Sequence, residues 1–126
     1  MPSLHWQLEA IRGEIQDNKR HAHELAASVT DEQWMTRPEP DRWSMAECVI
    51  HLNLTSAAML ASLNAAIAAA PSGKQPRRYR RDPIGWMLCW TMEPPVRKQF
   101  PTTAPFLPQR ADSKESTLAE FDAQHA

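Results

Sequence analysis

The sequence predicts an all-α protein built as a helical bundle, and three observations support this. Two long segments, residues 4–27 and 45–70, repeat apolar side chains at spacings of three, four and seven, which places them on one face of a helix. Both segments contain about 25 residues, so each helix would span roughly 35 Å. Sustained two-residue alternation, the signature of strands, is absent. Two amphipathic helices of matched length favour near-antiparallel packing.

The first predicted helix covers residues 4–27, with Ser3 as its expected N-cap. Its apolar stripe consists of Leu4, Leu8, Ile11, Ile15, Ala22, Leu25 and Val29. A short capped turn is expected next, at residues 30–34. Pro38 and Pro40 then keep the chain extended, because a residue that precedes a proline avoids the helical region.

The second predicted helix begins after Ser44. Ser44 and Glu47 form an S-x-x-E capping box, in which each side chain can bond the backbone N–H of the other residue. Trp43 precedes the cap, where it can pack against the first turn. The apolar stripe of this helix consists of Met45, Cys48, Val49, Leu52, Met59, Leu60, Leu63 and Ile67.

Less helix is expected in the remainder of the chain. A short apolar helix covers residues 83–92, with Trp86 and Trp90 one turn apart and expected in the core or at the bundle cap. A proline-rich connection, residues 93–108, leads to a third long helix near Ser113. Either these segments cover the two long apolar stripes, or another chain does, or the single domain at residues 1–126 is incomplete.

Composition limits the class of protein. At 126 residues and a net charge of -1, the chain is expected to form one soluble domain. The N-terminus lacks a basic start followed by an apolar run, and the apolar run at residues 84–92 is about half of a membrane span. We therefore expect a cytoplasmic protein with no membrane partner.

The charge is unevenly distributed. Residues 71–111 carry eight basic and two acidic side chains, whereas residues 1–70 carry five basic and nine acidic ones. A basic loop at residues 74–81 could bind phosphates, but a solvated loop is the favoured interpretation. Nucleic acid is an unlikely partner because the rest of the chain is acidic.

His51 is the leading candidate for chemistry, although a histidine on a half-buried helix is more often structural. Glu47 lies one turn before His51 and could accept a hydrogen bond from its ring, as partners of metal-binding histidines do. His21 and His23 point about 200° apart on a helix, so they cannot share an ion and are expected at a solvated helix end. Cys48 is expected to be a small buried thiol.

The sequence resembles a known family in several of these stretches. The residues are Gln33-Trp34 to Pro38, Arg42-Trp43-Ser44 followed by His51-Leu52, and a run from Pro94-Pro95 to Pro108 that leads into Leu118 and Phe121. Together they resemble the DinB-like (DinB/YfiT) superfamily, in particular its DinB_2 branch. The resemblance covers most of the chain, and its specificity depends on about ten residues.

The resemblance implies an up-down-down-up four-helix bundle that holds a divalent metal, of zinc or nickel type, with three histidines. His51 matches the ligand on the second helix. The other two ligands, four apart on the last long helix, have no counterpart in this sequence. We therefore expect the last helix or helices to be missing or truncated in this chain, the metal site to be incomplete, and a divalent metal to bind weakly or not at all.

The function implied by the resemblance is that of a metal-dependent transferase or hydrolase acting with a thiol or water, and a small-molecule thiol is an implied partner. The alternative is a non-enzymatic helical module that forms a homodimer or binds another protein, with His51 in a structural role.

Overall fold

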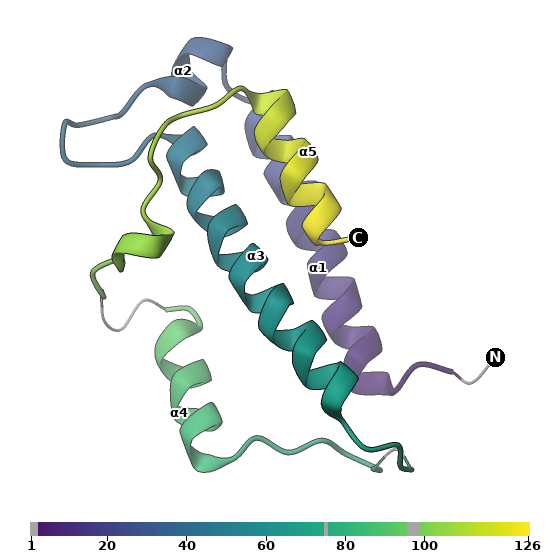
Figure 1. The fold of residues 1–126 in the computed structure, drawn as a ribbon. Helices are drawn as coiled ribbons and strands as arrows, with labels where there is room; N and C mark the ends of the chain where they lie inside the picture. Colours follow the sequence, from purple (N-terminus) through teal and green to yellow (C-terminus); the bar gives the residue numbers. More distant parts are fainter. Residues whose placement is uncertain (1–2, 75, 96–98) are drawn as a thin grey trace.

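The protein is all-helical in the part of the chain that its computed structural model describes, residues 3–74, 76–95 and 99–126 (Figure 1). This confirms the predicted fold class. The elements are α1 (Trp6–Ala27), α2 (Asp31–Met35), α3 (Met45–Ala69), α4 (Pro83–Met92), the 3-10 turn η1 (Ala104–Phe106) and α5 (Lys114–Gln124).

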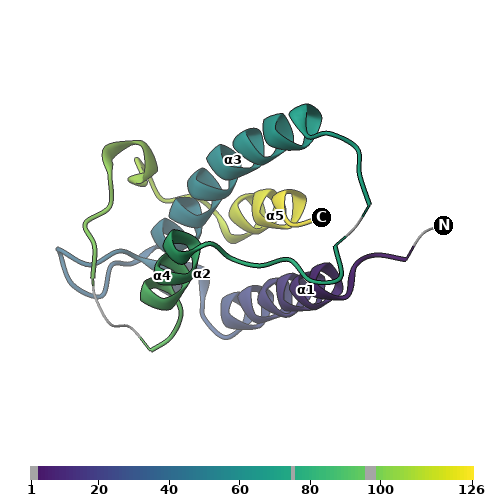
Figure 2. The ribbon, with the colours of Figure 1, turned by 90° about the horizontal axis from the view of Figure 1, so that it is seen from below.

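The three longest packed helices run up, down and down. α1 and α3 are antiparallel, and α5 runs in the direction of α3 (Figure 1). α5 packs mainly against α3 and also contacts α1, and it lies between them when the bundle is seen from below (Figure 2). This order agrees with the first three helices of the arrangement that the resemblance implies.

Local capping determines where two of the helices begin, as the sequence predicts. Thr30 and Ser44 each form a complete capping box, with Gln33 and Glu47 respectively. The expectation of Ser3 as the N-cap of α1 is wrong. The N-cap is the buried His5, whose Nδ1 accepts a hydrogen bond from the Gln7 N–H at 3.2 Å. The His5 ring is held in this position by the loop that follows α3, because its Nε2 lies 3.0 Å from the Pro76 backbone oxygen.

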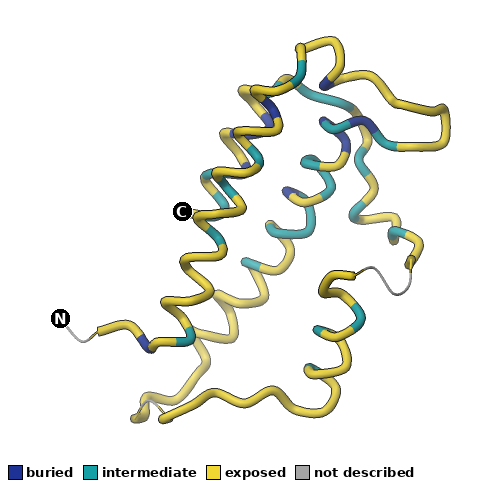
Figure 3. Tube along the Cα trace, turned by 180° about the vertical axis from the view of Figure 1, so that it is seen from behind, coloured by how far each residue is buried: buried dark blue, intermediate teal, exposed yellow. Residues whose placement is uncertain are grey.

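The core gathers at one end of the bundle, which we call the closed end (Figure 3). Its buried cluster comprises Ala26, Trp34, Ala46 and Leu118, and Phe121 is buried as well. Along the other half of α1 and α3 the apolar stripes are exposed, and this exposed stripe on α3 contains Met59, Leu63 and Ile67.

α4 contributes nothing to this core. None of its residues is buried, and Trp86 is 60% exposed. The expectation that Trp86 and Trp90 lie in the core or at the bundle cap is therefore wrong. The physical reason is that α4 stands apart from the long helices, with at most slight contact with any of them.

α3 has the length and apolar composition needed to cross a membrane, and no other helix in the described residues has both. A single helix of this kind is weak grounds for a membrane span, because bundle helices have the same properties. Glu47 and Asn53 are buried on α3 and hydrogen-bonded to other parts of the protein. We therefore treat α3 as a helix of the bundle.

Candidate functional site

An ion pair between buried Glu47 and half-exposed Arg37 fixes the start of α3. The Arg37 guanidinium donates from Nε to Glu47 Oε1 at 2.8 Å and from Nη2 to Glu47 Oε2 at 2.6 Å. Glu47 Oε1 also accepts from the backbone N–H of Ser44 at 3.2 Å and from its hydroxyl at 3.1 Å. Chiefly through the Arg37 hydrogen bonds, these contacts lower the pKa of Glu47 to about 2, although burial opposes the shift. Glu47 is therefore ionised at every physiological pH.

Because Arg37 and Ser44 occupy the Glu47 carboxylate, the prediction that Glu47 orients His51 is wrong. The ring of His51 is oriented instead by Phe106 in η1, whose backbone oxygen lies 2.8 Å from Nδ1. The sequence gives no sign of this partner, which lies 55 positions further along the chain.

The Phe106 contact determines the form of the His51 imidazole. A carbonyl oxygen can only accept, so Nδ1 must carry the hydrogen. In the neutral ring Nε2 then keeps a free lone pair, which is the form in which a histidine binds a metal through Nε2. The Trp43 ring lies 5.2 Å from the His51 ring, centre to centre, and limits its movement. His51 is therefore held as a ready Nε2 ligand.

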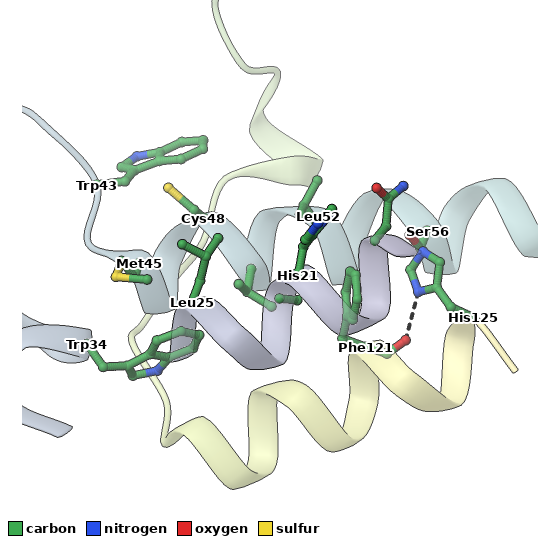
Figure 4. A pocket seen from close by; sticks show the side chains of 13 residues that line it. His21, Leu25, Trp34, Trp43, Met45, Cys48, Leu52, Ser56, Phe121 and His125 are labelled. Carbon is green, nitrogen blue, oxygen red and sulfur yellow. Dashed lines mark hydrogen bonds between the residues drawn. The ribbon is translucent and has the colours of Figure 1, made fainter. Parts of the chain in front are cut away.

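A groove of about 550 Å³ lies between α1, α2, α3 and α5, and His51 is not one of its lining residues (Figure 4). Its lining includes Cys48, Leu52 and Trp43, and the Trp43 ring also contacts the His51 ring. Most of the lining is apolar, and four polar side chains, Asn18, His21, Ser56 and His125, add hydrogen-bonding groups. The groove is thus suited to a mainly apolar small molecule with one or two polar groups.

Cys48 is exposed along this groove, so the expectation of a buried thiol is wrong. Its side of α3 faces the groove, which no other helix fills. Partial burial, with a smaller contribution from the Glu47 charge, raises the pKa of the Cys48 thiol. Because the thiolate is the nucleophile, a thiol with a raised pKa is a poor attacking group at neutral pH.

The remaining histidines have separate positions. His23 Nε2 lies 2.8 Å from Asp122 Oδ2 and links α1 to α5, and its side chain is 49% exposed, in agreement with the expected solvated position. His21 is exposed and lines the groove, and its neighbour there, His125, donates from Nδ1 to the Phe121 carbonyl at 2.7 Å. Sequence reasoning missed both of these groove histidines because it considered their spacing alone.

The donor set for a metal is incomplete in the residues that the structure describes. They contain no group of three histidine, cysteine, aspartate or glutamate side chains that could hold an ion. A catalytic metal site uses about three protein ligands. His51 fits the role of one ligand, and by itself it does not form a metal centre.

Comparison with known proteins identifies a family. The DinB_2 model, which describes the DinB superfamily, matches residues 14–126. The match includes α1 from Glu14 onward and every later helix. No curated protein and no solved structure matches the chain at a significant level.

Proposed function

The chain belongs to the DinB superfamily, and we propose that it serves as a metal-dependent transferase or hydrolase in which His51 is one ligand of a divalent metal of zinc or nickel type. The observation that carries the proposal is the hydrogen bond of Nδ1 to Phe106, because it leaves Nε2 free to bind. The described residues supply one of about three ligands, so we derive no reaction step through the metal.

The groove, which His51 does not line but whose lining residue Trp43 contacts the His51 ring, supports a role in binding a small substrate. Its apolar lining excludes water from a ligand, and the imidazoles of His21 and His125 can orient a polar group. The attacking group would come from outside the chain, as a water molecule or a small-molecule thiol. Cys48 does not supply it, because its raised pKa keeps the thiol protonated.

Metal titration followed by NMR tests the role of His51. Paramagnetic Ni²⁺ added to the 126-residue chain should broaden the ring signals of His51 and Trp43 before those of His23. His51→Ala should abolish the broadening at Trp43, whereas the control His23→Ala should leave it unchanged. Equal broadening at Trp43 with and without the His51 ring would refute the assignment.

Calorimetry tests the incomplete donor set independently. With one protein ligand, Zn²⁺ and Ni²⁺ should bind more weakly than micromolar. Sub-micromolar binding to the monomer that disappears in His51→Ala would mean that further ligands exist in the chain, and the statement that the set is incomplete would then be wrong.

The second candidate function is a helical interaction module that forms a homodimer. The observation that favours it is the exposed apolar stripe of α3, in which Met59 is 67% exposed and Ile67 is 64% exposed. Sedimentation velocity distinguishes the two candidates. A strict monomer over a wide concentration range would exclude the module as a homodimer, and a stable dimer without metal broadening at His51 would favour it.

A further inference from the structure

The part of the basic loop at residues 76–81 is held in place by the start of α1. Three consecutive side chains, the N-cap His5 and the first two residues of α1, bond to the loop backbone. His5 Nε2 lies 3.0 Å from the Pro76 backbone oxygen, and Trp6 Nε1 donates to the Arg77 backbone oxygen at 3.4 Å. Gln7 bonds to Tyr79. Gln7 forms a double contact, accepting from the Tyr79 N–H at 2.6 Å and donating to the Tyr79 oxygen at 3.1 Å. The loop passes the N-terminal end of α1 (Figure 2). The backbone that carries its arginines is therefore anchored to α1.

Two hollows lie along this anchored loop, and both are lined by Arg78 and Arg80. The larger, about 740 Å³, is also lined by Gln7, Leu8, Ile11, Tyr79, Arg81 and Trp86. The smaller, about 500 Å³, adds Trp6 and Arg77. The larger hollow therefore combines guanidinium groups, two aromatic rings and an apolar patch from α1.

Within the described residues, two arginines at the larger hollow have no ion-pair partner. Arg78 and Arg80 form no ion pair with any residue that the structure describes, and Arg81 has only a long contact with Glu93, at 3.8 Å. The nearest acidic residue in sequence, Asp82, uses its carboxylate to cap α4 by accepting from the Gly85 N–H at 2.6 Å. A guanidinium fork matches phosphate oxygens, and two unpaired arginines match the charge of a dianion better than that of a single carboxylate.

The rings in the same hollow favour a flat ligand. Trp86 is 60% exposed and Tyr79 is 45% exposed, so both present an open surface to a ligand. The Tyr79 ring is positioned by the His5 ring, at 4.7 Å between centres. Leu8 and Ile11 provide apolar contact from α1. Exposed aromatic rings beside arginines are suited to stacking a planar base or ring.

We propose that the larger hollow, between α1, the basic loop and Trp86, binds a small molecule that carries a phosphate group on a planar ring system. Nucleoside phosphates belong to this class. Arg78 and Arg80 bind the phosphate, and Trp86 stacks on the ring. The site lies at the end of the bundle opposite the start of α3 (Figure 1). It is therefore independent of the proposed role of His51.

Binding of three probes to the 126-residue chain tests the proposal, with tryptophan fluorescence and calorimetry as readouts. ADP, which has both parts of the ligand, should bind about tenfold more tightly than either inorganic phosphate or adenosine. Added salt should weaken ADP binding because it screens the phosphate contacts. Equal affinity for adenosine and ADP, or no binding of ADP, would overturn the proposal.

Variants separate the two contacts. The double variant Arg78→Gln with Arg80→Gln should lose about tenfold in ADP affinity, and Trp86→Leu should weaken ADP binding without changing that of phosphate. A matched control removes two exposed arginines elsewhere, Arg42→Gln with Arg110→Gln, and should leave ADP affinity unchanged. If the control lost as much ADP affinity, the effect would be due to net charge alone, and the proposed site would be wrong. All of the substituted side chains are exposed, and circular dichroism verifies that each variant folds.

Larger anionic partners are distinguished in the same assay. A single-stranded oligonucleotide, and vesicles containing phosphatidylserine, are each added in competition with ADP. If either partner binds more tightly than ADP and is not displaced by it, the basic loop serves as a macromolecular contact surface and the small-ligand proposal is wrong. Displacement of the bound partner by ADP would support the hollow as the binding site.

Discussion

The two halves of the bundle use the same two long helices and differ in what covers them. At the closed end, α2 packs against α3 and α5 packs against both α1 and α3, and Trp34 is 1% exposed there. Its indole Nε1 donates to the Asp112 oxygen at 3.1 Å, and buried Asn53 donates to the Thr117 oxygen at 3.1 Å. In the other half, Leu63 on the same apolar stripe of α3 is 55% exposed.

This difference shows that helical periodicity determines which side chains share one face of a helix. It does not determine whether that face is buried. Burial at the closed end depends on partners from distant parts of the chain, because Leu118 and Phe121 come from α5. Only the N-terminal half of α3 has such a partner. Both candidate sites follow from this asymmetry. His51 lies where α3 is packed, and the arginine hollow lies where α1 is open.

The largest effect is expected when Trp34 is truncated. Trp34→Ala removes a fully buried ring and its hydrogen bond to Asp112, so the free energy of unfolding should fall by about 4 kcal/mol. Urea unfolding measures this loss. The matched control, Trp86→Ala in the open region, should cost less than about 0.5 kcal/mol. Equal losses would erase the distinction between the two halves.

Removing the Glu47 charge is the second test of the closed end. Glu47→Gln weakens the paired hydrogen bonds with Arg37 and the capping box, and it should cost about 2 kcal/mol of unfolding free energy. Glu120→Gln, at an exposed position on α5, is the control and should be near neutral. A neutral result for Glu47→Gln would mean that the ion pair does not hold the start of α3.

The same carboxylate predicts a pH dependence. Its pKa is lowered from 4.5 to about 2 in the folded protein, so the stabilisation is fully present above pH 4.5. It is lost as the pH falls from 4.5 towards 2, because in this range the unfolded state takes up a proton that the folded state does not. Unfolding free energies measured across this window should fall more steeply in the wild type than in Glu47→Gln. Parallel curves would contradict the assignment.

The features that the sequence predicted are those encoded within a few residues. The capping boxes at Thr30 and Ser44 depend on partners three positions away, and the boundaries of α4 depend on local composition. His51 was identified from the spacing of a short motif. The family match confirms the resemblance, whereas the role of His51 as a ligand stays a proposal.

The features that the sequence could not predict depend on where loops bring the chain. Arg37 reaches Glu47 because the loop between α2 and α3 turns back, and Phe106 reaches His51 from η1. No local pattern encodes either pair. The exposure of Cys48 and Trp86 was unpredictable for a related reason, because a side chain on an apolar stripe is buried only where another element covers it.

A smaller effect is expected at His51. The Nδ1–Phe106 hydrogen bond should contribute about 1 kcal/mol, so His51→Ala should lower the free energy of unfolding by roughly this amount. Nitrogen chemical shifts of the neutral ring should show the hydrogen on Nδ1 and a free Nε2. The opposite tautomer would remove the main support for His51 as a metal ligand.

The smallest change in the free energy of unfolding is expected on the exposed stripe of α3. Its dependence on protein concentration shows whether another copy covers this stripe. If the chain is monomeric, Leu63→Ala should change the free energy of unfolding by less than about 0.5 kcal/mol at any protein concentration, because more than half of the residue is already exposed to water. If a second copy covers the stripe, the wild type should become more stable as its concentration rises, and Leu63→Ala should reduce that gain. Unfolding measured at two well-separated concentrations therefore determines whether the open half is a free surface or an interface.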